Sequence, residues 1–462
     1  MKLRSVRGFL WVGWLALAAA VPLACGSDDG KKAAYDEGGA GGEAGGKPVN
    51  AAGSKSQPMP SAGEGGVPGG GGVPSVPNAG EAGTPSEQPT GGSGGAPSEP
   101  MGGTAGEGGA TSIPVLPQCQ GPTLSFKDPF IEQVVMDAVG VEVGPLTPAD
   151  VAGLTDLTIP FPDTDFDLTG LECLSALQHL DCSGGAVGAP LDVLALLPNL
   201  ESIDYQHSYI DDLTPFAVLT NVKSLDFGDN FIQDLTPLAD LTQLESLGLA
   251  GIGGFGGGSL DIGPLASLTN LRALDLSSDK VTDGTALASL AQLQELSLRQ
   301  TQLASYAVVS NLTQLQMLDL SESDITTLPD LSKLTKLTSL NIAYDTPASF
   351  APLSKLTKLT SLNAASTGLA DLSVIASLIK LDTLDVSYNT FTDATVLGAL
   401  PLLSTLDISY DSAITSLEPL VQSQYIGTGD YITALALDCD THGTRITALI
   451  AKGAVVGNSC GL

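Results

Sequence analysis

Few side chains in this sequence could perform chemistry, because its 462 residues include only six cysteines and three histidines. A metal centre or a nucleophilic site needs such groups at short, fixed spacings. These cysteines and histidines do not have metal-binding spacing, and we find neither a phosphate-binding loop nor a nucleophile elbow between a strand and a helix. The sequence therefore predicts a protein that is not an enzyme, holds no metal and needs no cofactor.

The histidines themselves are poorly placed to act together. His179 and His207 fall in adjacent copies of the repeat described below, five positions apart in its frame. Five residues of strand span about 16 Å at about 3.3 Å per residue. This separation predicts solvated surface roles rather than a shared metal ion, and His442 near the C-terminus is expected to be structural.

The elements that must position any functional side chain are copies of one repeat. The phrase LSKLTKLTSLN occurs twice without change, starting at Leu331 and at Leu353. Its core pattern, LxxLxL, recurs mostly in steps of 22 residues, with 23 and 27 as the exceptions. Eleven copies open at Leu177, Leu200, Val222, Leu244, Leu271, Leu293, Leu315, Leu337, Leu359, Leu381 and Leu403. This periodicity matches the leucine-rich repeat signature.

The repeat has a direct physical interpretation. A copy that contains one short strand, a turn and a return segment cannot bury its leucines alone, whereas stacked copies bury them in one continuous core. Alternation along each strand sends the leucines inward and the intervening residues outward. We therefore predict an α/β fold, a leucine-rich repeat solenoid whose curved parallel sheet has about eleven strands.

The detailed phrase resembles the 22-residue subclass of bacterial repeats found in internalins. The segment VKSLDFGDNFIQDLTPL, which begins at Val222, is a near-consensus copy, and the resemblance extends over about residues 120–460. The family places Asn three residues after the last strand Leu, where only Asn230 and Asn389 keep it. Ser208, Asp279, Thr301, Ser323, Asp345, Thr367 and Asp411 replace it, and they can make weaker local turn bonds.

Both ends of a solenoid need caps, because a bare end exposes apolar core. At the front, Asp128, Pro129 and Gly140 predict the N-cap, first position and stop of a helix. Its apolar face includes Phe130, Val134 and Ala138, with Ile131 and Val135 beside them. A second short helix is expected from Thr147-Pro148, and the pair resembles the family's helical cap. At the back, the segment from Asp430 onward resembles a strand–helix–strand cap closed by two cysteines, which implies a Cys439–Cys460 disulfide.

The N-terminus predicts export. Lys2, Arg4 and Arg7 precede an apolar run that is too short to span a membrane, as in a signal peptide. Ala24-Cys25 resembles the lipobox of bacterial lipoproteins, although Pro22 replaces the usual Leu. The resemblance implies a lipid on Cys25, and a plain secretory signal cut near Ala20 is the alternative.

The following segment, residues 25–113, is rich in Gly, Ala, Pro and Ser and has too little apolar surface to fold. A chain of this kind has an end-to-end distance of roughly 50 Å, which suits a tether to a surface. We therefore divide the chain into a signal peptide (1–24), a disordered tether (25–113), a helical cap (114–170), leucine-rich repeats (171–420) and a C-terminal cap (421–462). The expected location is the outer membrane or cell surface of a bacterium.

The remaining cysteines are Cys119, Cys173 and Cys182, and an oxidising compartment favours disulfides. Cys182 occupies an inward strand position, where a buried free thiol is the simplest expectation. Cys173 lies four residues before its strand, on the other side of the coil. These positions favour a Cys119–Cys173 disulfide.

The most informative surface is the predicted concave face. Its middle outward position carries seven aspartates, which we call the acidic column: Asp181, Asp204, Asp226, Asp275, Asp319, Asp385 and Asp407. Strand spacing of about 4.8 Å brings like charges together, so raised carboxylate pKa values are expected. The column is either a face for a basic partner or divalent cations, or the common consensus of this repeat class.

Other residues extend this surface. Tyr344, Tyr388 and Tyr410 are expected along its outer edge, whereas Lys333, Lys336, Lys355 and Lys358 are expected on the other side. Phe255, in a glycine-rich insertion, is either a binding tip or part of a tolerated loop.

We predict a surface-anchored binding protein for a protein or glycan ligand, which could be basic. The chain carries a formal net charge of −32, and we expect no nucleic-acid partner and a monomer. The alternative is a structural acidic rod on a flexible stalk, without a specific ligand.

Overall fold

The computed structural model describes residues 116, 119–160, 166–185, 191–253 and 258–462. These residues all belong to one compact unit, Gly103–Leu462. The predictions for the signal peptide, for Cys25, for the tether and for Phe255 concern residues outside this described part. No helix within the described residues is both long and apolar enough to cross a bilayer.

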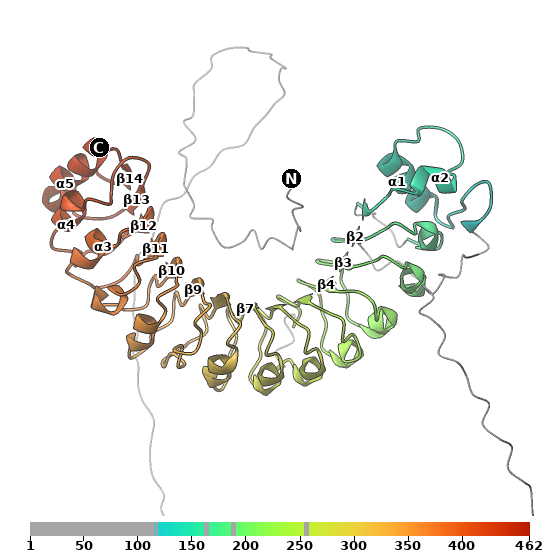
Figure 1. The fold of residues 1–462 in the computed structure, drawn as a ribbon, viewed down its shortest axis with the longest axis horizontal. Coiled ribbons are helices and arrows are strands. Elements are labelled where there is room, and N and C mark those ends of the chain that lie inside the picture. The colour runs from blue at the N-terminus through green and yellow to red at the C-terminus, as the bar shows by residue number, and fades with distance from the viewer. Residues whose placement is uncertain (1–115, 117–118, 161–165, 186–190, 254–257) are drawn as a thin grey trace, which may run out of the picture. The chain divides into compact units, whose positions relative to one another are not determined.

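The unit is built on one parallel sheet in which fourteen strands follow one another in sequence order (Figure 1). The eleven predicted copies supply β2 to β12. The sheet is longer than predicted because the front cap contributes β1 and the C-terminal cap contributes two more strands. The bounds are β1 Asp156–Thr158, β2 His179–Asp181, β3 Ser202–Asp204, β4 Ser224–Asp226, β5 Ser246–Gly248, β6 Ala273–Asp275, β7 Glu295–Ser297, β8 Met317–Asp319, β9 Ser339–Asn341, β10 Ser361–Asn363, β11 Thr383–Asp385, β12 Thr405–Asp407, β13 Tyr431–Ala434 and β14 Val455–Asn458.

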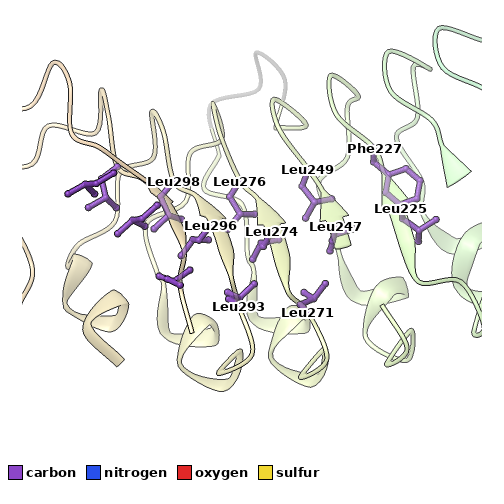
Figure 2. Packing of buried hydrophobic residues seen from close by; sticks show 14 of the residues in the cluster. Leu225, Phe227, Leu247, Leu249, Leu271, Leu274, Leu276, Leu293, Leu296 and Leu298 are labelled. Carbon is purple, nitrogen blue, oxygen red and sulfur yellow. The ribbon is translucent and has the colours of Figure 1, made fainter. Parts of the chain in front are cut away.

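The core lies behind the sheet and runs through every copy. Because each strand pairs with its neighbour at the equivalent residue, Leu225 lies beside Leu247 and Leu274 beside Leu296. Figure 2 shows these leucines stacked in columns, each less than 4% exposed. Burial of one leucine side chain contributes about 1.5–3 kcal/mol, so the stack as a whole is strongly favoured over isolated copies.

The return segments of the copies are short helical turns on the outer side of the sheet (Figure 1). A 22-residue copy leaves room for about one turn, which favours 3₁₀ geometry over a longer α-helix. Several of these turns begin after an exposed Asp that accepts a hydrogen bond from the N–H two residues on, as Asp212 does from Thr214. The 3₁₀ turns are Leu171–Cys173, Leu191–Leu196, Thr214–Val218, Thr236–Leu238, Gly263–Ser267, Thr285–Ser289, Tyr306–Asn311, Ala351–Lys355 and Leu372–Ile375, and the short α-helices are α3 Thr395–Ala399 and α4 Glu418–Gln422.

The front cap contains α1, Pro129–Val139, and α2, Pro148–Val151. Asp128 caps α1 by accepting from the N–H of Phe130, and Gly140 ends it in the left-handed conformation, as the sequence predicted. The predicted buried face was partly wrong. Ile131, Val134 and Val135 are buried, whereas Ala138 is exposed and Phe130 only half-buried, because the core lies under the first two turns of the helix.

The C-terminal cap has the expected strand–helix–strand order, with α5, Cys439–Ala451, between β13 and β14. Disulfides join Cys439 to Cys460 and Cys119 to Cys173, with Cα–Cα distances of 5.5 and 5.2 Å. Both pairs are those expected from the sequence. Cys182 is a buried free thiol behind the sheet, and burial raises its pKa to about 12.

Candidate binding face

The acidic column lies where each repeat strand ends, and every member makes the same local bond. One carboxylate oxygen accepts a hydrogen bond from the N–H two residues later, as Asp226 does from Gly228 at 3.0 Å. This bond closes an Asx-type turn at the exit of the strand. The other six acceptor and donor pairs are Asp181 and Ser183, Asp204 and Gln206, Asp275 and Ser277, Asp319 and Ser321, Asp385 and Ser387, and Asp407 and Ser409.

The turn bond does not need a charge. Asn341 and Asn363 occupy the same position in β9 and β10 and accept from Ala343 and Ala365 at 3.0 Å through their amide oxygens. The column therefore has a structural role in its own repeat, whatever it binds.

The column is less exposed than the sequence indicated. We expected Asp204 and Asp226 to point to solvent, but both are only half-exposed, and Asp275 and Asp319 are buried. The carboxylate of Asp226 lies between the residues of neighbouring repeats. The side-chain amide of Gln206 donates to both Asp204 and Asp226 at 3.1 Å, and a Cβ added at Gly248 would collide with the Asp226 carboxylate.

This burial sets the protonation behaviour of the column. It raises the pKa values of Asp226 and Asp275 to about 6 and that of Asp319 to about 7, and it also raises the pKa values of Asp204 and Asp385. The expected direction is confirmed for these five residues, but the expected cause contributes less than burial does. Loss of hydration is the largest contribution, and repulsion from neighbouring carboxylates is a smaller one.

The three tyrosines lie in the turns that follow β9, β11 and β12, and we call them the tyrosine edge. Tyr344, Tyr388 and Tyr410 are 59%, 50% and 45% exposed, and all three have left-handed backbone with φ of 62°, 58° and 62°. The rings of Tyr388 and Tyr410 stack with centroids 4.3 Å apart and planes within 10°. Tyr344 lies two repeats before Tyr388, with the small Ser366 at the equivalent position between them.

Sequence reasoning missed a second aromatic pair on the same side of the strands. Tyr209 and Phe231 stack with centroids 6.1 Å apart in the turns after β3 and β4, and Tyr209 is 71% exposed. The sequence could have revealed this pair, because Tyr209 and Phe231 are 22 positions apart. Each directly follows the position at which the family places Asn, here Ser208 and Asn230. Exposed aromatic pairs therefore occur near both ends of the repeat array.

The four lysines expected away from the acidic column lie at the opposite edge, whereas Arg299, which follows β7, acts on Asp275 and Asp319 of the column. Lys333 and Lys336 precede β9 and Lys355 and Lys358 precede β10, whereas the tyrosine edge follows the strands, and all four lysines are exposed. They are therefore unable to neutralise the acidic column directly.

The histidines have separate environments. The Nδ1 of His179 lies 2.7 Å from the Ser202 hydroxyl, His207 contacts Asp229 at 3.1 Å, and His442 is buried in α5. Within the described residues, no three His, Cys, Asp or Glu side chains form a group able to hold a metal ion.

The fold defines a class: the described part of this chain is a leucine-rich repeat solenoid with a disulfide-closed C-terminal cap. The chain is similar to a solved internalin (inlF) of Listeria monocytogenes, with 27% identity and a TM-score of 0.52 over 65% of this chain and 94% of that one. It is also similar to a leucine-rich repeat protein of Leptospira interrogans, with 21% identity and a TM-score of 0.54 over 67% and 80% of the two chains, a likeness of fold alone. No family model and no curated protein matches the chain.

Proposed function

We propose that this protein is a non-enzymatic binding protein that holds a basic segment of a partner protein against the tyrosine edge and the acidic column. The observation that carries the proposal is the exposure of Tyr344, Tyr388 and Tyr410 on left-handed backbone.

The fold does not require tyrosine at these turns. The same left-handed position holds a range of small or polar residues in other repeats, and a bulky residue with positive φ is uncommon. Large, half-exposed rings at such positions are the anchors that interfaces favour. In the other repeats this position holds Gly184, His207, Asp229, Gly251, Ser278, Gln300, Glu322 and Ser366.

The charge around the tyrosine edge favours a basic partner. Burial and Tyr410 are the larger causes of the raised pKa of Tyr388, and Asp407 is close enough to add to them. Asp385 ends the strand that leads into the same turn. A guanidinium or ammonium group gains from both an aromatic face and nearby carboxylates. An arginine- or lysine-bearing segment therefore suits the surface better than a neutral sugar does.

We further propose that the protein acts outside the cytoplasm, anchored through a lipid on Cys25 and the segment that follows it. Two disulfides in the described residues suit an oxidising compartment, and the likeness to an internalin is in keeping with an exported bacterial protein.

A capture experiment against envelope and extracellular extracts tests the proposal. The bait is the full-length protein, compared with a Tyr388→Ser, Tyr410→Ser variant that carries the serine found at positions 278 and 366. Lys336→Gln and Lys358→Gln, on the opposite edge, provide the matched control. A partner that is retained by the control and lost by the tyrosine variant supports the proposal.

Three other outcomes would count against it. Equal capture by all three proteins would move the binding site away from the tyrosine edge. Repeated failure to capture any partner would favour the alternative function, a structural rod at the envelope surface. A neutral glycan that binds in competition with an arginine-rich peptide would correct the partner class.

A further inference from the structure

A second row of polar residues lies inside the solenoid, in nine of the eleven repeats, three residues after the last inward-facing strand position. We call it the inner ladder, and every member is at most 5% exposed. It is the row in which the family's Asn is mostly replaced. Its members are Ser208, Asn230, Asp279, Thr301, Ser323, Asp345, Thr367, Asn389 and Asp411.

The Asn, Ser and Thr members of the inner ladder act as hydrogen-bond donors, whereas the same position holds Gly185 and Ile252 in two other repeats. The amide nitrogens of Asn230 and Asn389 donate to the carbonyl three residues earlier, Phe227 and Val386, at 2.7 Å. The hydroxyl of Thr301 likewise donates to the carbonyl three residues earlier, that of Leu298, at 2.6 Å.

The serines of the ladder donate to neighbouring carbonyls as well. Ser323 reaches Leu298 at 2.8 Å, and Ser208 reaches Gln206 at 3.1 Å. The Asn and Ser side chains therefore both donate hydrogen bonds to backbone carbonyls of this turn.

The three aspartates of the ladder supply the acceptor half of this pattern only. Asp345 Oδ1 accepts from the N–H groups of Ser323 and Ile325 at 3.0 and 2.9 Å, as Asn230 Oδ1 accepts from Ser208 and Ile210. The second oxygen, Oδ2, then takes the place of the asparagine nitrogen. In Asp279, Asp345 and Asp411 this Oδ2 is buried and makes no hydrogen bond among the described residues.

In Asn230 and Asn389 the nitrogen at this place contacts backbone carbonyls. An ionised Oδ2 in the same place would be buried without hydration or a donor, which is costly. A protonated carboxyl has one O–H donor, and its geometry matches that of the asparagine amide. We infer that Asp279, Asp345 and Asp411 hold the solenoid as neutral acids, each donating from Oδ2 to a backbone carbonyl, so that mild acid tightens these turns and alkali loosens them.

The charged surroundings favour the same form. Asp345 faces Glu322 and Asp324, Asp411 faces Asp385 and Asp407, and Asp279 faces Asp229 and Asp275. Burial is the first cause and this acidic environment a further one. Together they raise the pKa of Asp345 to about 6 and those of Asp279 and Asp411 to about 7.

The sign of the effect follows from these directions. An aspartate in the unfolded chain titrates near pH 4, below its folded pKa here. The stabilisation is therefore fully present below about pH 4 and is lost as the pH rises through 6 to 7.

Two of these acids lie under the proposed binding edge. Asp345 and Asp411 directly follow Tyr344 and Tyr410, so their protonation would also fix the turns that present the rings. This last consequence rests on the proposed function, whereas the ladder chemistry does not.

Thermal unfolding of the full-length protein between pH 4 and pH 8 tests the inference. In Asp345→Asn and Asp411→Asn the amide supplies the donor at every pH. Each variant should match the parent at pH 4 and melt higher by on the order of 2 °C at pH 8, with a flatter pH profile. The reverse change, Asn389→Asp, should introduce a new loss of stability as the pH rises above about 4.

Asp371→Asn serves as the matched control, because Asp371 is an exposed turn residue whose pKa is lowered by its bonds to Ser373. It should not gain stability at pH 8. The infrared band of protonated carboxyl groups should also weaken in Asp345→Asn at pH 5. Equal pH profiles in parent and ladder variants, or an undiminished band, would overturn the inference. If the parent protein fails to bind an arginine-rich peptide but the ladder variants show the expected pH profiles, the result counts against the proposed function alone.

Discussion

Asn363 in β10 pairs in register with Asp385 in β11. Each accepts a hydrogen bond at 3.0 Å from the backbone N–H two residues further along the sequence. An amide and a carboxylate thus do the same structural work in adjacent strands. Any function specific to the acidic column must therefore reside in its charge rather than in its hydrogen bond. This separation makes Asp-to-Asn substitution a clean probe.

The first prediction concerns that charge. Asp204→Asn with Asp226→Asn should keep the turn bonds, leave the fold intact and reduce both the affinity for a basic partner and the salt dependence of association. Burial raises both pKa values in the folded state, so ionisation at neutral pH costs stability. The double variant should therefore unfold at a higher temperature than the parent at pH 8, and the difference should shrink at pH 4.

The control for this experiment is Asp226→Ala, which removes the acceptor as well as the charge. It should be less stable than Asp226→Asn by about 1 kcal/mol, the usual contribution of one hydrogen bond. Unchanged affinity and unchanged salt dependence in the double Asn variant would leave the column with its turn-forming role alone.

The second prediction concerns the tyrosine edge. Tyr388→Ser or Tyr410→Ser should weaken binding of an arginine-rich peptide by about tenfold or more, because exposed aromatic anchors dominate interface energies. The fold should not suffer, because Ser366 has the same left-handed backbone with φ of 57°. Isothermal titration gives the affinity and circular dichroism gives the stability; a destabilised fold would mean that the stacked rings serve packing instead.

The third prediction concerns the C-terminal cap. The Cys439–Cys460 disulfide closes a segment with a sequence separation of 21 residues, for which the contribution to stability is about 2–4 kcal/mol. Cys439→Ser with Cys460→Ser should lower the free energy of unfolding by that amount, with the loss concentrated around α5 and β14 in hydrogen exchange. Two free thiols in peptide maps of the exported protein would contradict the pairing.

The fourth prediction concerns the anchor. Cys25→Ala should release the protein from membranes into the soluble fraction if Cys25 carries a lipid. Mass spectrometry of the mature N-terminus should find acyl chains on Cys25 in the parent protein. An unmodified mature N-terminus near Val21 would instead favour the plain secretory signal, and one that begins after Cys25 would likewise exclude the lipid.

Periodicity was sufficient to predict the solenoid, because inward leucines such as Leu225 and Leu247 repeat at the spacing that stacking requires. The cysteine pairs followed from position and resemblance. The two extra cap strands at the C-terminus lie outside the regular spacing, so the repeat count alone underestimated the sheet. Which residues of α1 are exposed likewise depends on where the core ends, and this cannot be predicted from the pattern of nearby residues.

The electrostatics were harder to predict. The outward strand position of Asp226 predicted a solvent-exposed carboxylate. The carboxylate instead lies against Gly248 and accepts a hydrogen bond from Gln206, and these contacts depend on side-chain packing between neighbouring copies. The inner ladder was recognised as a row of substituted asparagines. The orphaned Oδ2 of Asp345 became evident only once both backbone donors to Oδ1 were placed.

The strict sequence order of the strands has an evolutionary consequence. Each strand pairs only with the strands before and after it in the chain, so no long-range partner fixes the number of copies. Recombination between the identical stretches at Leu331 and Leu353 would remove or add one 22-residue unit and still join β8 to an equivalent strand in register. Such events therefore lengthen or shorten the protein by whole repeats. They change the distance between the aromatic pairs at the two ends and leave the contacts between neighbouring repeats unchanged.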